Sequence, residues 1–358
     1  MRRGLLNWSK EELPESVFDG RVERLQGAMG DAGLGAVLVY TNFPRPAAVS
    51  YLTHFVPYWN QCLAVVLPEG PPVLIVSLSK RVAGWIMETA HVADVICTPN
   101  IGAELTSLLA GAGLASNKIG IVELDKMPRP IVQAVLDADA GYDVSDASAL
   151  FAGIRNPADE AEVTLSAKAA KMAADALSGA AQNGGDPDLA AIERDVRLAG
   201  AEDVFMDIAP DLTQDANYIR ADRPMELGAR YAIRLSVVYN GSWVRYGRSF
   251  ERAGDGEADA AIAEYLTAAI PPLNDGGDLQ PLAAHAGSLA PLQWGGVTVE
   301  GCIGTRPLQL LPSPPAGAIV SLGFSFQGAQ GHWLVDEPVI LSANAIIPAA
   351  RLVPAASA

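Results

Sequence analysis

The placement of arginine says most about the chemistry that this chain could perform. Four arginines stand close together in the sequence, at Arg223, Arg234, Arg245 and Arg248. A guanidinium group carries a fixed positive charge and offers only hydrogen-bond donors, so it cannot ligate a divalent metal ion. Its planar fork of donors suits a carboxylate or a phosphate. Buried together, these arginines would either bind a small anionic molecule or pair with acids of the chain itself.

The candidates for acid–base chemistry are His332, Asp336 and Glu300. If the chain is extended here, residues 332, 334 and 336 share one face of a strand. A histidine–carboxylate pair on that face could transfer protons during a reaction. The alternative is that His332 only caps a glycine-rich turn, because isolated histidines are mostly structural or exposed.

Cys302 is a candidate nucleophile, because cations such as Arg234 or Arg245 nearby would lower the pKa of its thiol. The alternative is a buried, small apolar side chain in a strand. The three cysteines and four histidines are scattered along the chain without metal-ligand spacing. We therefore expect no metal site, no cofactor and no disulfide framework.

Composition excludes several classes of partner. Half of the 358 residues are apolar and 18% are charged, which is typical of a globular protein, and the length favours two domains. A net charge of −16 makes nucleic acid and anionic membranes poor partners, because phosphate binding needs clustered cations. No apolar run reaches the ~18 residues of a membrane span, and the first residues lack the apolar core of a signal peptide. We expect a cytoplasmic protein.

The first 150 residues read as an α/β domain. Apolar residues at helical spacing follow Pro14, and the glycines Gly33 and Gly35 end that helix before an apolar strand at 36–40. Further strands are expected at 62–67 and 73–76, and helical and short apolar stretches alternate from there to residue 136.

Residues 151–358 read as a second domain. Pro157 and the acids after it are typical of a helix start. Two long alanine-rich helices are expected at about 158–182 and 187–199, followed by strands, and the tail at 348–358 is expected to be loosely held.

The segment from Leu227 to Phe250 resembles the central β-hairpin of the creatinase/prolidase/methionine aminopeptidase family. In that family two aspartates of the hairpin bridge a dinuclear metal centre, and Arg234 and Arg245 stand at those two positions. The stretch before the hairpin is similar to a family segment that begins with histidine and tyrosine. Asn217 stands at the histidine position and Tyr218 follows it.

Two further stretches carry the resemblance. Residues 316–324 resemble the family strand Pro-Gly-Met-Val-Phe-Thr-Ile-Glu-Pro, with Gly323 in place of a glutamate ligand, and Asp336 stands where the last family glutamate belongs. Residues 294–307 fall where the family has a glycine-rich strand with one or two histidines, and this stretch contains none.

The resemblance implies an α+β pita-bread C-terminal domain preceded by a smaller creatinase-like α/β domain. Creatinase is a metal-independent member that hydrolyses a C–N bond, so the expected function is a metal-independent hydrolase, or another acid–base enzyme, for a small anionic substrate. The alternative is a non-catalytic pita-bread binding protein. The expected substrate-binding residues are Arg223, Arg234, Arg245, Arg248, Asn217, Tyr218, Trp294 and His54. Three tryptophans near this site could wall the cavity and bind a cation or stack on an aromatic substrate, or they could equally be core residues: Trp243, Trp294 and Trp333.

The family further implies a homodimer. Residues 42–61 resemble a loop that reaches over the partner's cavity in dimeric relatives, and His54 stands at a position where a glycine is usual. His54 would then contribute a polar group to the other subunit. The alternative is a surface histidine beside an aromatic turn.

Overall fold

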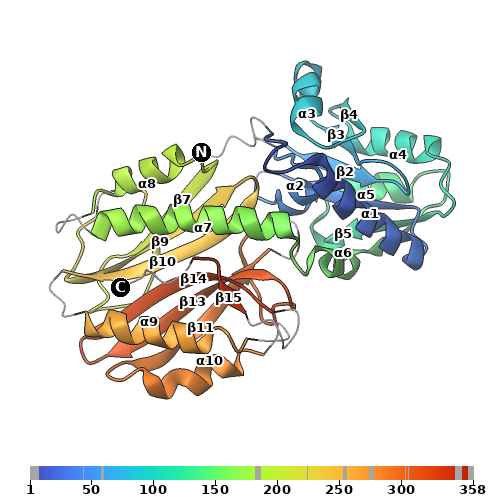
Figure 1. Cartoon of the computed structure of the whole chain (residues 1–358). Helices are drawn as coiled ribbons and strands as arrows, with labels where there is room; N and C mark the ends of the chain where they lie inside the picture. Colours follow the sequence, from blue (N-terminus) through green and yellow to red (C-terminus); the bar gives the residue numbers. More distant parts are fainter. Residues whose placement is uncertain are drawn as a thin grey trace. The chain divides into compact units, whose positions relative to one another are not determined.

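The computed structural model describes residues 8–42, 44–57, 60–181, 187–223, 225–252, 256–273, 278–302, 304, 306–342 and 349–353. The chain forms two compact units (Figure 1). The first consists of Met1–Arg155 with Cys302–Pro307, and the second of Asn156–Gly301 with Leu308–Ala358. Tyr58 and Trp59 of the expected dimer loop, and most of the expected C-terminal tail, lie outside the described residues.

The first unit contains a mixed six-stranded sheet in the order β4-β3-β2-β1-β5-β6. The central strands are parallel where β1 meets β5 and antiparallel where β1 meets β2. The strands are β1 (Ala36–Thr41), β2 (Cys62–Val66), β3 (Val73–Val76), β4 (Asp94–Cys97), β5 (Lys118–Val122) and β6 (Asp143–Asp146).

Helices cover both faces of this sheet, because its central strands are apolar on both sides. One core packs under α1 and α2 and contains Leu25 and Leu52, while another packs under α4 and α5 and contains Leu105 and Ile131. The helices are α1 (Glu15–Ala32), α2 (Ala47–Thr53), α3 (Ala83–Thr89), α4 (Ile101–Gly111), α5 (Arg129–Leu136) and α6 (Ser148–Arg155), with 3-10 turns η1 (Lys80–Val82) and η2 (Leu124–Lys126).

The second unit is built on an antiparallel sheet of nine described strands. Their order is β12-β11-β13-β14-β10-β9-β7-β8, and β15 pairs with β14. The strands are β7 (Asp203–Ala209), β8 (Ile219–Arg220), β9 (Arg230–Tyr239), β10 (Ser242–Glu251), β11 (Gln293–Gly301), β12 (Gln309–Leu310), β13 (Ile319–Gly328), β14 (Gly331–Ile340) and β15 (Ala350–Arg351).

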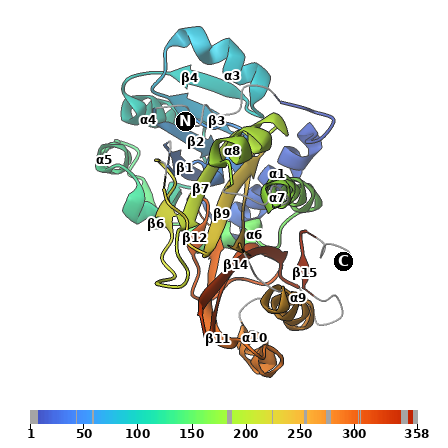
Figure 2. The ribbon, with the colours of Figure 1, turned by 90° about the vertical axis from the view of Figure 1, so that its left-hand side faces the viewer.

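The long helices of this unit lie on one face of the sheet (Figure 2). Ala169 and Ala173 of α7 (Glu160–Ala181) pack on β9 and β10, because their small side chains let the helix approach the sheet closely. Tyr265 of α9 (Glu257–Ala269) packs on Phe324 and Phe326 of β13. The remaining helices are α8 (Leu189–Leu198), α10 (Gln280–Ala284) and the 3-10 turn η3 (His285–Ser288).

The predicted fold classes are confirmed in both units. The first helix ends where expected, since Gly33 adopts φ 65°, a left-handed conformation that glycine reaches without strain. The alanine-rich helices α7 and α8 also lie where their patterns predict them. Strand β6 is not evident from the sequence, because its residues are polar and mostly exposed. None of the described helices is long and apolar enough to cross a membrane.

Candidate functional site

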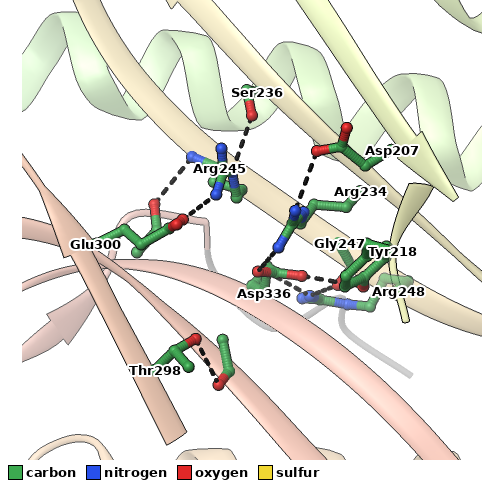
Figure 3. A network of polar contacts seen from close by, with 12 residues as sticks. Asp207, Tyr218, Arg234, Ser236, Arg245, Gly247, Arg248, Thr298, Glu300 and Asp336 are labelled. Carbon is green, nitrogen blue, oxygen red and sulfur yellow. Dashed lines mark hydrogen bonds and ion pairs between the residues drawn. The ribbon is translucent and has the colours of Figure 1, made fainter. Parts of the chain in front are cut away.

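One row of residues crosses the C-terminal sheet on the face opposite α7 and α9. Residues directly opposite on neighbouring strands share a face, so the strand register places these side chains side by side. The row runs through Asp207, Arg234, Gly247, Asp336, Gly323 and Thr298, one residue from each of β7, β9, β10, β14, β13 and β11. We call these six residues the central row; the labelled members appear in Figure 3.

Asp336 is the buried acid of the central row, with 3% of its surface exposed. The hydroxyl of Tyr218 donates a hydrogen bond to its Oδ2 at 3.1 Å, and Nη1 of Arg234 lies 3.9 Å from its Oδ1. Burial raises the pKa of Asp336 to about 6, although the charges of Arg234 and Arg245 and the hydrogen bond from Tyr218 oppose that shift. Its protonation therefore changes close to neutral pH.

The two glycines of the central row make room for this carboxyl group. A Cβ atom at Gly247 would lie 2.6 Å from Oδ2 of Asp336, and one at Gly323 would lie 3.1 Å from Oδ1. A side chain at either position would press on the acid. Gly323 thus leaves the space that a glutamate at this position would fill.

Arg234 lies between two carboxylates and an aromatic ring. Its Nη2 donates to Oδ2 of Asp207 at 3.1 Å, and Asp207 also pairs with Arg220 at 3.2 Å. The guanidinium carbon stands 4.1 Å from the centre of the Tyr218 ring, which is cation–π geometry. Burial and the negative charge of Asp336 together raise the pKa of Tyr218, so its hydroxyl stays protonated and acts as a donor.

Arg245 makes its own ion pair beside the central row. It pairs with Glu300, its Nε donates to the Ser236 hydroxyl at 2.9 Å, and its backbone N–H donates to the Ser321 hydroxyl at 2.9 Å (Figure 3). Both arginines at the hairpin positions therefore have carboxylate partners within the chain. These partners include Asp336 and Glu300, the two acids named as candidates for acid–base chemistry.

Three of the expected substrate-binding residues lie elsewhere. Arg248 is three residues from Arg245, and strand alternation turns it to the helix-bearing face, where it pairs with Glu337 at 2.7 Å. Arg223 and Asn217 are exposed in the segment around β8. Arg248 thus faces away from Arg234, while the substrate-binding roles of Arg223 and Asn217 stay predictions.

His332 does not pair with Asp336, and that expectation is wrong. The two residues share one face of β14 but stand four positions apart, which is roughly 13 Å along a strand. The backbone N–H of His332 donates to the carbonyl of Leu212 at 2.8 Å. The alternation of side chains along a strand correctly predicts that His332 and Asp336 share a face, but it does not bring them into contact.

Trp294 and Cys302 also have other surroundings than expected. The ring of Trp294 lies against those of Tyr265, Phe324 and Phe326 in tilted and edge-on contacts under α9, which is the core alternative. Cys302 belongs to the first compact unit, where its carbonyl accepts a hydrogen bond from Nε of Arg155 at 2.9 Å.

His54 is buried, with 1% of its surface exposed, so both the partner-facing and the surface expectations are wrong for this conformation. Its Nδ1 lies 3.1 Å from the carbonyl oxygen of Thr89, and its ring packs beside Trp8 and Phe18. Such a ring offers no polar edge to another subunit.

Asp207 is the site residue that sequence reasoning missed. It lies in β7, between apolar residues that pack under α7 and α8. An acid that alternates with buried apolar residues is costly unless it is paired, and this signal could have marked it. Among the described residues, no group of three or more His, Cys, Asp or Glu side chains is arranged to hold a metal ion.

Comparison of this chain with known protein families and solved structures agrees with this architecture. Residues 21–156 match the family described as "Creatinase/Prolidase N-terminal domain". No curated protein sequence matches the chain at a significant level.

Solved structures with the same fold cover nearly the whole chain. X-Pro aminopeptidase from Thermotoga maritima is 15% identical with a TM-score of 0.72, over 93% of this chain and 97% of its own. Prolidase from Pyrococcus furiosus is 14% identical with a TM-score of 0.68, over 94% and 100%. The N-terminal domain of the FACT complex subunit SPT16 from chickpea is 12% identical with a TM-score of 0.58, over 92% and 94%. Residues 21–156 thus carry the creatinase/prolidase N-terminal domain, and the chain as a whole has the fold of prolidases and X-Pro aminopeptidases.

Proposed function

We propose that the chain is a metal-independent hydrolase that acts by acid–base chemistry on a small anionic substrate. The observation that carries this proposal is Asp336, a buried carboxyl with a pKa of about 6 at the centre of the row. A base with a pKa near the working pH transfers protons efficiently. Perturbed carboxyls of this kind concentrate at functional sites.

The donor set supports the metal-free part of the proposal. Guanidinium groups have no lone pair to give a cation, and those of Arg234 and Arg245 stand at the two positions where the resemblance implies bridging aspartates. Gly323 supplies no donor at a third position. Asp336 and Glu300 remain, and each already faces a guanidinium group. These residues do not fit a divalent metal, so no step is assigned to one.

In this site Asp336 would accept a proton from an attacking water and would then donate it to the nitrogen that leaves as the C–N bond breaks. Tyr218 would hold the carboxyl in place through its hydrogen bond. Arg245 would bind the carboxylate of the substrate by displacing Glu300 from its fork. Arg234, 3.9 Å from Asp336, would stabilise the negative charge that develops on the substrate at the carbon attacked by water, next to the C–N bond that is hydrolysed.

A non-catalytic binding protein is the second candidate. The observation that favours it is that Arg234 and Arg245 both already have carboxylate partners inside the chain, so their charges do not require a ligand. One structural neighbour, the N-terminal domain of SPT16, is described as part of a complex.

Turnover without metal separates these candidates. The protein, treated with EDTA and checked by elemental analysis, is incubated with dipeptides, N-acyl amino acids and guanidino acids, and products are measured by mass spectrometry. We expect no bound transition metal, turnover that EDTA does not change, and a loss of about 100-fold or more in Asp336→Asn. Activity that requires added zinc, manganese or cobalt contradicts the proposal, and saturable binding without turnover favours the second candidate.

A further inference from the structure

A second group of charged residues lies on the helix-bearing face of the C-terminal sheet. Nη2 of Arg248 donates to Oε2 of Glu337 at 2.7 Å, and Nε of Arg351 donates to the other oxygen, Oε1, also at 2.7 Å. Glu337 has no exposed surface. One buried carboxylate therefore serves two guanidinium groups. Asp259 also lies close enough to interact with the charge of Arg248, whereas the only ion pair of Arg351 among the described residues is the one with Glu337.

A groove of about 1120 Å³ lies beside this group, between α7 and α9. Figure 1 shows the two helices on the same side of the sheet, with strands behind them. Small-molecule sites typically span ~300–1,000 Å³, so the groove has room for a ligand of that size. Its apolar walls include Leu177 of α7, Ile262 and Leu266 of α9, and Phe250, Val335 and Leu352.

The charges that line the groove favour an anion. Lys168, Lys171, Arg248 and Arg351 are its cationic lining residues, against Asp175 and Asp259. Lys171 and Asp175 pair with each other at 2.8 Å on the exposed surface of α7. Within the part of the chain that the structure describes, the terminal nitrogens of Arg351 have no hydrogen-bond partner. Because 14% of this side chain is exposed, a ligand in the groove could reach them.

We propose that this groove binds an amphipathic monocarboxylate, a molecule with one carboxylate head and an apolar chain. The head would accept hydrogen bonds from the two terminal nitrogens of Arg351, whose Nε alone donates to Glu337. The chain would lie between α7 and α9 and bury apolar surface against their side chains. A neutral alcohol should bind more weakly because it lacks the charge, and a short carboxylate should bind more weakly because it lacks the apolar surface. This site is separate from the central row and does not depend on the function proposed for it.

The test compares head groups and variants in the full-length protein. Binding of decanoate, 1-decanol and acetate is measured by displacement of a fluorescent undecanoic acid derivative, below the concentration at which micelles form. We expect decanoate to bind about ten-fold more tightly than 1-decanol, and acetate not to compete. Arg351→Gln should weaken decanoate about ten-fold while leaving 1-decanol unchanged.

Ala263→Phe, which fills the groove from α9, should weaken decanoate and 1-decanol alike. The matched controls are Ala260→Phe on the same helix and Arg194→Gln on α8, neither of which lines the groove, and both should bind as the parent does. Equal affinity for decanoate and 1-decanol, unchanged binding in Arg351→Gln, or no saturable binding overturns the proposal. If Arg351→Gln fails to fold, the head-group comparison and Ala263→Phe still decide it.

Discussion

At the scale of the residue, positive charge is built into the chain at the centre of this site. Arg234 faces Asp207 and Asp336, and Arg245 pairs with Glu300. Unlike a bound metal ion, these cations are part of the chain and cannot be lost to solvent. A partly buried ion pair contributes little compared with an apolar pair of equal volume, but removing one partner leaves an uncompensated charge. The acids and the arginines therefore depend on each other.

The Arg245–Glu300 pair allows a direct test of that dependence. Glu300→Gln removes the negative charge and leaves the guanidinium group of Arg245 partly buried without compensation. We expect the free energy of unfolding, measured with urea at pH 7, to fall by about 2 kcal/mol. The exposed pair Arg194–Asp195 serves as a control, because surface pairs contribute at most ~1 kcal/mol. An effect of Glu300→Gln no larger than that of Asp195→Asn would show that solvent already screens the buried pair.

Asp336 makes stability depend on pH in a defined window. Its folded-state pKa of about 6 lies above the usual carboxyl value, so between about pH 4 and pH 6 the folded state holds a proton that the unfolded state has released. Stability from this group is complete below about pH 4 and is lost as pH rises through 6. The loss is on the order of 3 kcal/mol for two pKa units.

Comparison with Asp336→Asn isolates this contribution, because asparagine does not titrate. Urea unfolding from pH 4 to pH 7 should show the stability of the variant rising relative to that of the parent chain as pH increases. Parallel curves for the two proteins would mean that the pKa of Asp336 is not raised.

At the scale of the element, the two glycines beside Asp336 on the neighbouring strands leave the space that its carboxyl group occupies. Gly247→Ala would place a methyl group 2.6 Å from a carboxylate oxygen, so we expect destabilisation of about 1–3 kcal/mol from overpacking. Gly153→Ala in α6 is the matched control, because no atom lies within 4 Å of the added methyl group and alanine favours helices by up to ~1 kcal/mol. Thermal unfolding of both variants gives the comparison, and a neutral Gly247→Ala would show that Asp336 can move aside.

The elements were largely predictable and the contacts within the site were not. Helical spacing and glycine stops predict α1, α7 and α8, because these signals are local. The partners of Arg234 depend on the register of β7 against β9, which joins residues far apart in sequence, so Asp207 was missed. The position of Arg248 on the helix-bearing face could have been predicted, because residues 245 and 248 are an odd number of positions apart and therefore lie on opposite faces of a strand.

At the scale of the whole molecule, the property to be measured is the oligomeric state of the chain. We predict a homodimer, as the family resemblance implies, and closed two-fold dimers are the commonest oligomers. His54 is buried, so the dimer would not use its ring. Light scattering at micromolar concentration should give about twice the chain mass of 37.4 kDa. A mass that stays at the single-chain value on ten-fold concentration argues for a monomer.

Strand β14 joins the two charged groups of the C-terminal unit. Asp336 and Glu337 are consecutive, so one peptide unit carries the acid of the central row on one face and the acid beneath the groove on the other. The carbonyl of Asp336 also accepts a hydrogen bond from Nη1 of Arg248 at 3.2 Å. If a ligand in the groove draws Arg248 toward itself, the affinity at the central row changes by some factor. Thermodynamic reciprocity then requires that a ligand of the central row change affinity in the groove by the same factor.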